Sequence, residues 1–373
     1  MSLLPLQGFT VGVTADRRWS EQAELLERRG AVVVHGPAID TEYLGSDDAL
    51  RSATVQVIQR RPAYLVATTG IGIRAWFEAA QAWGMGEDLS AALGETRIVA
   101  RGPKAAAAVQ AAGLDVGETV PSERLDDLVG GVLGDSVRGR AVAFQLYGER
   151  SSAAVDALRD AGAEVVEVPV YRWRLPADDT PARRLVDAAC DGQLDAVTFT
   201  SAPAVHNLVA IAGREDRDAD LLAAFNERGV LAGCVGPVCA EGARRVGIER
   251  PVAPERGRMG LLVRAVADEL QQRRRALRAA GATLVFQGRA ASVDDHVVTL
   301  TPQERAMLDI LLRRPRAVVA KSALLRDVWG GAVDPHALEA AVARLRRRLG
   351  PAAPALRSVR GRGYSLDVDA LAG

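Results

Sequence analysis

Lysine, cysteine and aromatic residues are scarce in this chain, and the shortages narrow what the protein can be. Aromatic residues make up 4% of 373 residues, and the three cysteines are Cys190, Cys234 and Cys239. Neither these thiols nor the four scattered histidines have the spacing of metal ligands. We therefore expect reduced cysteines and no metal site.

Long apolar runs are also lacking. Gly, Arg or Pro interrupts every apolar stretch before about 18 residues, the length that a membrane-spanning helix requires. Within residues 1–12 no basic segment precedes an apolar run, as it would in a signal peptide. With 48% hydrophobic and 25% charged residues, the composition suits two or three packed domains. We expect a globular cytoplasmic protein with no membrane partner.

A formal net charge of zero hides a strong segregation of charge. Residues 271–373 hold 18 Lys and Arg against 9 Asp and Glu, whereas the rest of the chain holds 29 against 38. Only Lys104 and Lys321 are lysines, so the abundance of arginine is partly a habit of composition. The segregation is more informative, because it predicts an anionic partner for the C-terminal end.

Two kinds of segment repeat within residues 1–268. Residues 10–39 and 141–171 each show the pattern strand, polar loop, amphipathic helix, Gly-Ala and strand. Residues 64–79 resemble residues 195–210, and a Gly-Pro pair that opens a helix follows each of them. Short apolar runs that alternate with helical patterns predict parallel sheets wrapped by helices.

The repeats predict two α/β lobes, the first about 1–38 with 172–268 and the second about 42–168. A cleft is expected between them, with Tyr171 in its hinge. Gly, Ser and Thr at strand ends leave helix N–H groups free for an anionic ligand. Arg17, Arg18 and Arg150 lie in the loops after the first strand of each strand–helix–strand unit, where they either contact ligand carboxylates or are simply solvated. The candidate ligand-binding residues are Arg17, Arg18, Thr69, Gly70, Gly102, Arg150, Ser201 and Gly236.

Five motifs in this region resemble the uroporphyrinogen-III synthase family: "TTGIGIRAWFE" (68–78), "GPKAAAAVQAAGL" (102–114), "GAEVVEVPVYRW" (162–173), "FTSAPAV" (199–205) and "VGPVCAEGARRVG" (235–247). The resemblance covers nearly all of residues 8–268. It implies two Rossmann- or flavodoxin-like lobes joined by two extended segments. It also implies a lyase that cyclises hydroxymethylbilane, with inversion of one ring and without a cofactor.

Tyr171 matches the tyrosine that the family places beside its substrate, so it is the candidate catalytic acid and a candidate ligand contact. The alternative is that Tyr171 merely packs its ring and bonds its hydroxyl. The family usually carries Thr after Gly-Pro-x, where this chain has Ala105 and Cys239. We therefore expect synthase activity to be absent or very low.

The last hundred residues show the pattern of a winged helix. After short strands, Thr301-Pro302-Gln303-Glu304 supplies a cap residue, a proline at the first helical position and an acid in the first turn. A second helix is expected from Lys321, a third from about 336 to 349, and a hairpin that turns at 361–363. The motifs "LTPQERAMLDIL", "LLRDVWGG", "VARLRRRLG" and "VRGRGYSL" resemble the OmpR/PhoB-type output domain of response regulators.

On the third helix, Val342, Leu345 and Leu349 recur at the spacing of a core face, which directs Arg344, Arg347 and Arg348 outward. The resemblance implies that Arg344 reads bases in the major groove of double-stranded DNA and that Arg360 enters the minor groove. Arg346 is expected to be solvated or salt-bridged. The expected phosphate or positioning contacts are Trp329, His336, Arg347, Arg348 and Arg362.

The first strand leads to no acidic pair, so the phosphorylated receiver that usually precedes such an output domain is not expected. We predict a synthase-like region at 1–268, a linker at 269–280 and the winged helix at 281–373. The arginine-rich linker continues the last helix toward the output domain, as either a stiff helical lever or a flexible tether. This combination resembles actinobacterial regulators of nitrate and nitrite assimilation.

The predicted function is a transcriptional regulator that binds DNA as a homodimer. Its synthase-like region would be a ligand sensor or a dimerisation module, and the ligand would be a tetrapyrrole or a small anion such as nitrite. The alternative is a working uroporphyrinogen-III synthase that also binds DNA.

Overall fold

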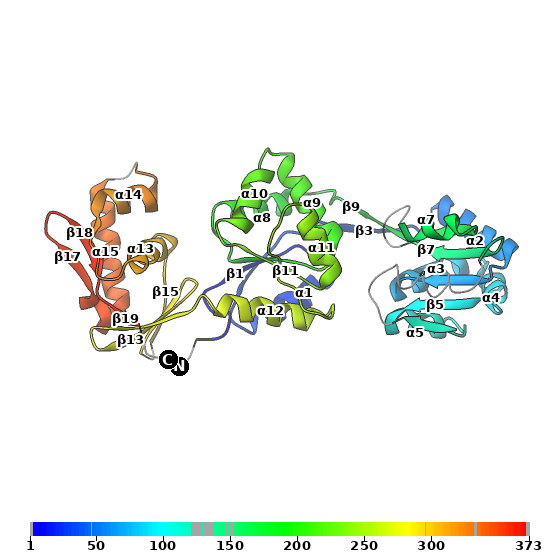
Figure 1. Cartoon of the computed structure of the whole chain (residues 1–373), viewed down its shortest axis with the longest axis horizontal. Coiled ribbons are helices and arrows are strands. Elements are labelled where there is room, and N and C mark those ends of the chain that lie inside the picture. Colours follow the sequence, from blue (N-terminus) through cyan, green and yellow to red (C-terminus); the bar gives the residue numbers. More distant parts are fainter. Residues whose placement is uncertain are drawn as a thin grey trace. The chain divides into compact units, whose positions relative to one another are not determined.

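The computed structural model describes residues 3–45, 47–120, 129, 137–146, 148, 153–294, 296–331 and 334–370. The chain forms two compact units, Met1–Ala38 with Asp178–Gly373 and Ile39–Ala177 (Figure 1). We call residues 3–38 with 178–271 lobe 1, residues 39–177 lobe 2, and residues 275–370 the winged-helix domain. Within the described ranges, no helix is both long and apolar enough to cross a membrane.

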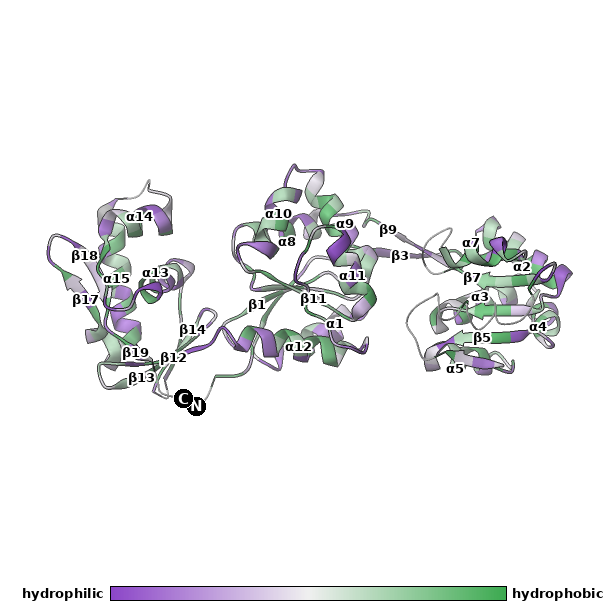
Figure 2. Cartoon of the chain, in the orientation of Figure 1, coloured by the Kyte–Doolittle hydropathy of each residue, from purple (hydrophilic) through white to green (hydrophobic). Residues whose placement is uncertain are grey.

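Lobe 2 is built on a parallel five-stranded sheet of order β6-β5-β4-β7-β8. Its strands are β4 (Tyr64–Ala67), β5 (Arg97–Arg101), β6 (Glu118–Val120), β7 (Ala141–Gln145) and β8 (Glu164–Val168). Alternate residues of β4 enter two separate cores, Leu65 on one face and Val66 on the other. Both faces are therefore covered, which is why the central strands are almost wholly hydrophobic (Figure 2). The covering helices are α2 (Asp48–Arg60), α3 (Gly70–Ala82), α4 (Gly86–Leu93), α5 (Gly102–Ala111) and α7 (Ala153–Asp160).

A two-stranded antiparallel ribbon carries the chain into and out of lobe 2. Strand β3 (Asp40–Tyr43) pairs with β9 (Tyr171–Arg174), and Tyr43 lies opposite Tyr171. Both strands are hydrophilic in Figure 2, and Glu42 forms ion pairs with Arg172 and Arg174. The two crossing segments expected from the repeats are thus this ribbon.

Lobe 1 contains a parallel four-stranded sheet of order β11-β10-β1-β2. Its strands are β1 (Thr10–Val13), β2 (Val32–His35), β10 (Ala196–Phe199) and β11 (Leu231–Cys234). The predicted strand–helix–strand repeats are confirmed as β1-α1-β2 and β7-α7-β8, whereas α4 and α10 were not predicted. The helices of lobe 1 are α1 (Trp19–Glu27), α8 (Thr180–Cys190), α9 (Ala202–Gly213), α10 (Asp218–Asn226), α11 (Pro237–Arg245) and α12 (Met259–Gln271).

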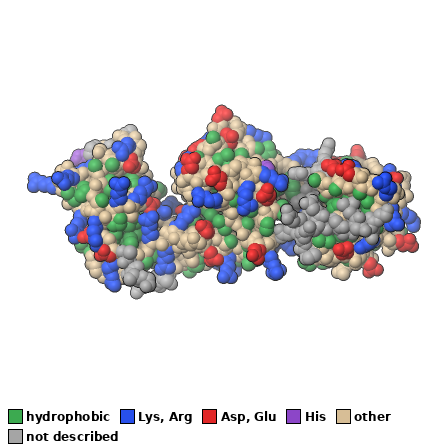
Figure 3. All heavy atoms as spheres, viewed as in Figure 1, with side chains coloured by type: hydrophobic (Ala, Val, Ile, Leu, Met, Phe, Trp, Pro, Cys, Tyr) green, Lys and Arg blue, Asp and Glu red, His purple; other side chains and the backbone are tan. Residues whose placement is uncertain are grey.

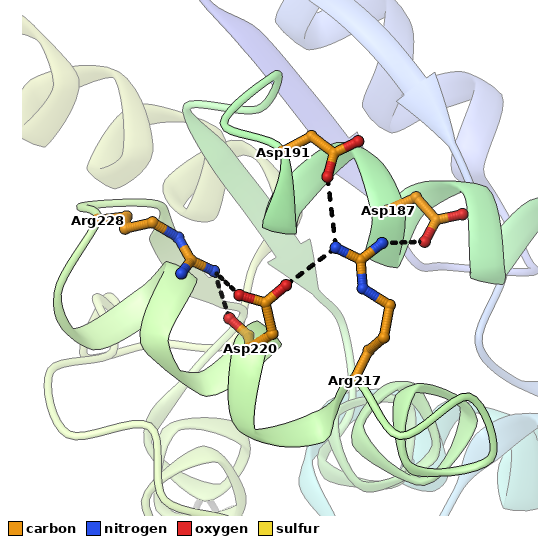
Figure 4. Close-up of polar contacts among 5 residues, drawn as sticks. All are labelled: Asp187, Asp191, Arg217, Asp220 and Arg228. Atoms are coloured by element: carbon orange, nitrogen blue, oxygen red, sulfur yellow. Dashed lines mark hydrogen bonds and ion pairs between the residues drawn. The ribbon is translucent and has the colours of Figure 1, made fainter. Parts of the chain in front are cut away.

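A charge network fastens α10 to α8 in lobe 1 (Figure 4). Arg217, directly before α10, bonds Asp187 and Asp191 of the α8 segment and also Asp220. Arg228 closes the far side through Asp220 at 2.7 Å. The carboxylates lower the free energy of the charged guanidinium, so the hydrogen bonds from Arg217 raise its pKa, those to Asp220 first.

The winged-helix domain opens with an antiparallel sheet of order β15-β14-β13-β12-β19, as its pattern of short strands predicted. The strands are β12 (Arg275–Ala279), β13 (Ala282–Gln287), β14 (Ala290–Val293), β15 (His296–Thr299) and β19 (Asp369–Ala370). A three-stranded sheet, β16-β18-β17, forms the wing. The remaining elements are α13 (Pro302–Arg313), β16 (Val319–Ala320), α14 (Lys321–Trp329), α15 (Pro335–Leu349), the 3₁₀ helix η1 (Gly350–Ala355), β17 (Leu356–Val359) and β18 (Gly363–Leu366).

Neither form expected of the linker at 269–280, a stiff helix or a flexible tether, describes most of this segment. Helix α12 ends at Gln271, and β12 begins at Arg275 and pairs with β13. Ala280 and Gly281, both with positive φ, make the tight turn between these strands. Pairing across the sheet places Leu277 opposite Leu284 on the domain core, and this tertiary pairing outweighs the helical preference of the arginine-rich sequence.

Candidate nucleic-acid interface and ligand loops

Helix α15 presents the predicted core face and the predicted solvent face. The Asp334 side chain caps its first turn by accepting a hydrogen bond from the His336 backbone N–H at 2.8 Å. Val342, Leu345 and Leu349 are at most 2% exposed, so this stripe fixes the rotation of the helix. The opposite side of α15 must therefore face solvent or a partner.

Four arginines of α15 and the wing have no intramolecular partner among the described residues. Arg344 and Arg347 lie on the exposed side of α15, and Arg360 and Arg362 flank the wing turn. Figure 3 shows Lys and Arg side chains at the outer edge of this domain, where Figure 1 places β17 and β18. Unpaired guanidinium groups on a helix and a hairpin form a surface that suits a polyanion.

The Arg346 side chain, on the same helix, is hydrogen-bonded to the wing. Its Nε and Nη2 donate to the Leu356 carbonyl at 3.1 and 2.7 Å, and Nη2 also donates to Ser358 Oγ at 2.9 Å. The expectation of a solvated or salt-bridged side chain is therefore wrong. Arg346 holds β17 against α15 and so fixes the wing beside this helix.

Arg348 is also committed, which contradicts its predicted outward orientation. Its Nε lies 3.0 Å from Glu304 Oε2, and Nη1 donates to the Thr299 carbonyl. Glu304 is fully buried and belongs to the capping box of α13 with Thr301. A buried carboxylate without a partner is costly, so Arg348 is held inward and is a poor candidate for phosphate contact.

His336 and Trp329 differ in their access to solvent. The His336 side chain is 86% exposed at the start of α15, with Nδ1 3.8 Å from Glu339 Oε2. Trp329 is half-buried and packs against the domain core. Of the two, His336 is placed to contact a partner and Trp329 to support α14.

The wing turn depends on two glycines. Gly361 has φ +72°, and a Cβ at Gly363, with φ +153°, would lie 1.9 Å from the Val319 carbonyl oxygen. A side chain at either position would strain the hairpin. These glycines hold Arg360 and Arg362 at its tip.

In lobe 2, Thr69 closes the loop between β4 and α3. Its Oγ1 accepts hydrogen bonds from the Gly72 N–H at 3.2 Å and from Gln145 Nε2 at 2.8 Å. These two hydrogen bonds use both lone pairs of Thr69 Oγ1, so the hydroxyl proton is free to be donated to a ligand. Thr69 is half-buried, and its hydroxyl suits a ligand that presents an acceptor such as a carboxylate.

Gln145, at the end of β7, is a site residue that the sequence analysis missed. It is fully buried, and its Oε1 accepts from the Thr68 and Thr69 N–H groups at 3.1 and 3.2 Å. The glutamine that ends the apolar strand "AVAFQ" was the available signal. A Cβ at Gly72 would lie 1.8 Å from Gln145 Nε2, so a side chain there would displace the Gln145 amide from Thr69.

The first turns of α3 and α5 meet in lobe 2. A Cβ at Gly70 would lie 2.2 Å from the Lys104 carbonyl oxygen, and Gly102 begins α5 with φ +73°. The predicted loop residues Gly70 and Gly102 thus belong to neighbouring helix N-termini. Free N–H groups gather here beside Thr69.

Lobe 1 repeats this arrangement with weaker bonds. Ser201 Oγ accepts from the Ala204 N–H at 3.4 Å at the start of α9, and Gly236 is the cap residue of α11. Arg18 forms an exposed ion pair with Glu21, and Arg17 is exposed in the same loop. Arg150, the matching arginine of lobe 2, lies outside the described residues.

Tyr171 is 5% exposed and packs in the core of lobe 2. It nevertheless borders a cavity of about 450 Å³, together with Asp47, Gln56 and Arg172. A second cavity of about 380 Å³ lies beside β3 and α3 and includes Arg74. Tyr171 therefore has both a structural role and access to a cavity within its own lobe.

The two positions where the family usually has threonine are buried. Ala105 is fully buried, and Cys239 is 3% exposed and donates its thiol to the Phe199 carbonyl at 3.6 Å. A hydrogen bond that the neighbouring Cys234 thiol donates to Cys239 Sγ, together with burial, raises the pKa of Cys234. Neither position offers a hydroxyl to a ligand.

Comparison with known proteins assigns both parts of the chain. The family described as "Uroporphyrinogen-III synthase HemD" matches residues 20–264, and "Transcriptional regulatory protein, C terminal" matches residues 295–366. The uncharacterized protein YjjA of Bacillus subtilis (strain 168) is 26% identical over 72% of this chain and 98% of its own length.

Two further relatives represent the two parts. A crystal structure of mutant uroporphyrinogen III synthase from the extremely thermophilic bacterium Thermus thermophilus has a TM-score of 0.59 at 29% identity, covering 71% of this chain and 99% of that one. The response regulator protein PmrA of Pseudomonas aeruginosa is 35% identical over 114 residues, 27% of this chain and 51% of its own.

Proposed function

Because the chain belongs to the uroporphyrinogen-III synthase family over residues 20–264 and carries a transcriptional-regulator winged helix after it, we propose that it is a DNA-binding transcriptional regulator whose synthase-like region senses a ligand. The observation that carries the DNA-binding part is the set of unpaired arginines. Seven arginines lie on α15 and the wing hairpin, and three of them bond other groups of the domain: Arg346, Arg348 and Arg357, which pairs with Asp367 at 2.6 Å. The other four, Arg344, Arg347, Arg360 and Arg362, remain for DNA.

These four side chains divide into two roles. Arg344 lies on α15, the recognition helix of this domain type, and a planar guanidinium can bond guanine O6 and N7 together. Arg360, at the wing tip, is proposed to enter the minor groove, where negative potential is concentrated. Arg347, Arg362 and His336 are proposed to contact phosphates and so to set the register of the domain on the duplex.

The ligand part of the proposal is supported by the loops at the strand ends. Thr69 has a hydroxyl proton free to donate, and Gly102, Ser201 and Gly236 stand at helix N-termini. Such groups favour an anionic molecule. We propose a tetrapyrrole carboxylate or a smaller anion such as nitrite, in a regulator of nitrate or nitrite assimilation that binds DNA as a homodimer.

A catalytic role receives less support. Tyr171 keeps the position of the family's tyrosine, but Ala105 and Cys239 remove two hydroxyls. One lost hydrogen bond to a charged group costs about 1.5 to 3 kcal/mol, so their loss weakens turnover without abolishing it by itself. Cyclisation of hydroxymethylbilane by the purified protein, lost again on Tyr171→Phe, would support the synthase alternative.

The test of the proposed function is selection of a duplex site by the full chain from random DNA, followed by titration of that site. Affinity is then measured with and without uroporphyrinogen III and with nitrite. The proposal expects one selected sequence with two half-sites about one helical turn apart, and an affinity that one of the ligands changes. Failure to select any sequence contradicts the DNA-binding part, and selection without any ligand effect contradicts the sensor part alone.

A further inference from the structure

The N-terminal segment, residues 3–9, packs against both lobe 1 and the winged-helix domain. Leu6 and Phe9 are fully buried in the core of lobe 1. Leu3, in contrast, packs with Val285 and Ala290 of the winged-helix domain. The segment therefore joins the two domains within this compact unit.

Gln287 binds this segment with an unusual concentration of hydrogen bonds. Its Nε2 lies within hydrogen-bond distance of three backbone carbonyls, those of Leu4 at 2.7 Å, Gln7 at 3.0 Å and Pro5 at 3.3 Å. Gln287 itself is 2% exposed, and the three bonds are partly buried. Replacing the side chain would remove this donor from the Pro5 and Gln7 carbonyls, whereas the Leu4 carbonyl would keep the Gln7 N–H at 3.0 Å.

The two backbones also touch directly. The Arg289 N–H donates to the Gly8 carbonyl at 2.7 Å. A Cβ at Gly8 would lie 2.3 Å from the Ala290 nitrogen, and a Cβ at Gly288 would lie 2.4 Å from the Gly8 oxygen. Both glycines have positive φ, so each is required by conformation and by space.

Side chains of opposite charge surround the same turn. Arg289 Nη2 donates to Thr10 Oγ1 at 3.3 Å, and Asp195 accepts from the Thr10 N–H at 2.8 Å. Arg273 and Arg305 lie near enough to Asp195 to act on its charge. Lobe 1 thus contributes the carboxylate of Asp195. The winged-helix domain contributes Arg289 and Arg305, and the connecting segment contributes Arg273.

Hydrogen bonds continue from this turn to the recognition helix. The Arg289 carbonyl accepts from the Leu300 N–H at 2.6 Å, next to the capping box in which the Thr301 N–H donates to Glu304 at 2.8 Å. Glu304 in turn holds Arg348 of α15 at 3.0 Å. A continuous chain of bonded groups therefore leads from Gly8 to α15.

We propose that the turn 287–290 is a joint that locks the winged-helix domain onto lobe 1 and that Glu304 and Arg348 are positioning residues that carry the orientation of lobe 1 to the recognition helix. Lobe 1 and the DNA-binding surface then move as one body instead of being tethered through residues 272–274. This inference rests on the proposed DNA binding for its functional consequence, but the joint itself does not.

The experiment uses the full chain and compares Gln287→Ala with Gln272→Ala, an exposed glutamine of the connecting segment whose side chain bonds Glu269. Hydrogen exchange is followed at residues 3–9 and 287–291. We expect Gln287→Ala to speed exchange there by about tenfold or more, with lobe 2 strands unchanged, and Gln272→Ala to match the wild type. Equal exchange in the two variants would overturn the joint. If Gln287→Ala fails to fold, Gly288→Ala provides a second variant, because its Cβ would collide with the Gly8 carbonyl oxygen at the joint.

The coupling is read from DNA affinity in a double-mutant cycle of Gln287→Ala and Arg348→Ala. We expect Gln287→Ala to lower affinity about 5-fold or more and the two losses not to add. Arg348→Lys, which can keep the bond to Glu304, should recover most of the loss. Faster exchange with unchanged affinity, or independent losses, would overturn the coupling. If the wild type binds no DNA, the proposed function fails while the exchange data still decide the joint.

Discussion

At the residue scale, intramolecular pairing separates arginines that are available to DNA from arginines that build the domain. Arg344→Ala should weaken binding to a selected site by about 1 to 3 kcal/mol and relax base preference at one position, because it removes a base contact. Its free energy of unfolding should stay within about 0.5 kcal/mol of the wild type, since Arg344 is exposed and has no partner within the described part of the chain. Arg346→Ala is the matched control, and it should lower stability by freeing the Leu356 carbonyl and Ser358. Equal losses on selected and random DNA for Arg344→Ala would contradict the base-reading role.

Thr69 gives a second prediction at this scale. Thr69→Val removes the acceptor for the Gly72 N–H and for Gln145 Nε2, so we expect a loss of about 1 to 2 kcal/mol in the free energy of unfolding. Thr69→Ser keeps the hydroxyl and should retain most of the stability. Denaturant unfolding of both variants measures the difference. If valine is as stable as serine here, the Thr69 hydroxyl does not hold the loop.

Single residues also mark the limit of prediction from sequence. Val342, Leu345 and Leu349 were correctly assigned to the core because helical periodicity alone fixes their face. The outward orientation predicted for Arg348 was wrong, because its partner Glu304 lies 44 positions away and only the packing of α13 against α15 brings them together. Gln145 was missed for the same reason, since its partners are 76 and 77 positions away.

At the element scale, the attachment of α10 to α8 should depend on pH. The hydrogen bond from Arg217 lowers the pKa of Asp220, followed by that from Arg228. A carboxyl group with a lowered folded pKa stabilises the fold above its ordinary value, 3.8, and this stability is lost as pH falls through the folded pKa. Arg217→Ala should therefore lower thermal stability near pH 7 and flatten its decline below about pH 4. A decline as steep as that of the wild type would contradict the role of this network.

Asp195 should show the opposite sign. Burial raises its pKa, although Arg305, Arg273 and Arg289 oppose the shift. A carboxyl with a raised folded pKa contributes stability below that value and loses it as pH rises through it. Asp195→Asn can keep the bond to the Thr10 N–H, so we expect its stability relative to the wild type to improve as pH rises from about 4 to 7. Urea unfolding across this range measures the trend, and a difference that stays constant with pH would contradict it.

Helices and turns could be predicted from the sequence where local signals, such as cap residues and turn glycines, agreed with the fold. The capping box at Thr301 fixed the start of α13, and Gly361 fixed the wing turn. Strand β12 did not follow, because its arginines show no strand pattern and only pairing with β13 makes it extended. Helices α4 and α10 were hidden within the segments between the repeated motifs.

At the scale of the whole molecule, most of the chain belongs to the uroporphyrinogen-III synthase family, and a winged-helix domain of the transcriptional-regulator type follows it. The repeats indicated both lobes because each strand–helix unit occurs twice, with a small hydroxyl residue, Thr69 or Ser201, at the matching strand end. The joint at Gln287 lay beyond prediction, since its partners are about 280 positions away in sequence.

The salt dependence of DNA binding by the full chain shows whether the four unpaired arginines contact phosphates. The logarithm of the association constant should fall linearly with the logarithm of salt concentration, with a slope of about 0.9 for each phosphate contact. Replacing Arg344, Arg347, Arg360 and Arg362 by alanine should make that slope shallower by about 2 to 3.6 per bound chain. A variant with the same change of charge outside the winged-helix domain, at the exposed Arg51, Arg184, Arg250 and Arg256, should keep the wild-type slope. If the two variants lose the same slope, or neither loses any, the four arginines are not the DNA-binding surface and the account is wrong.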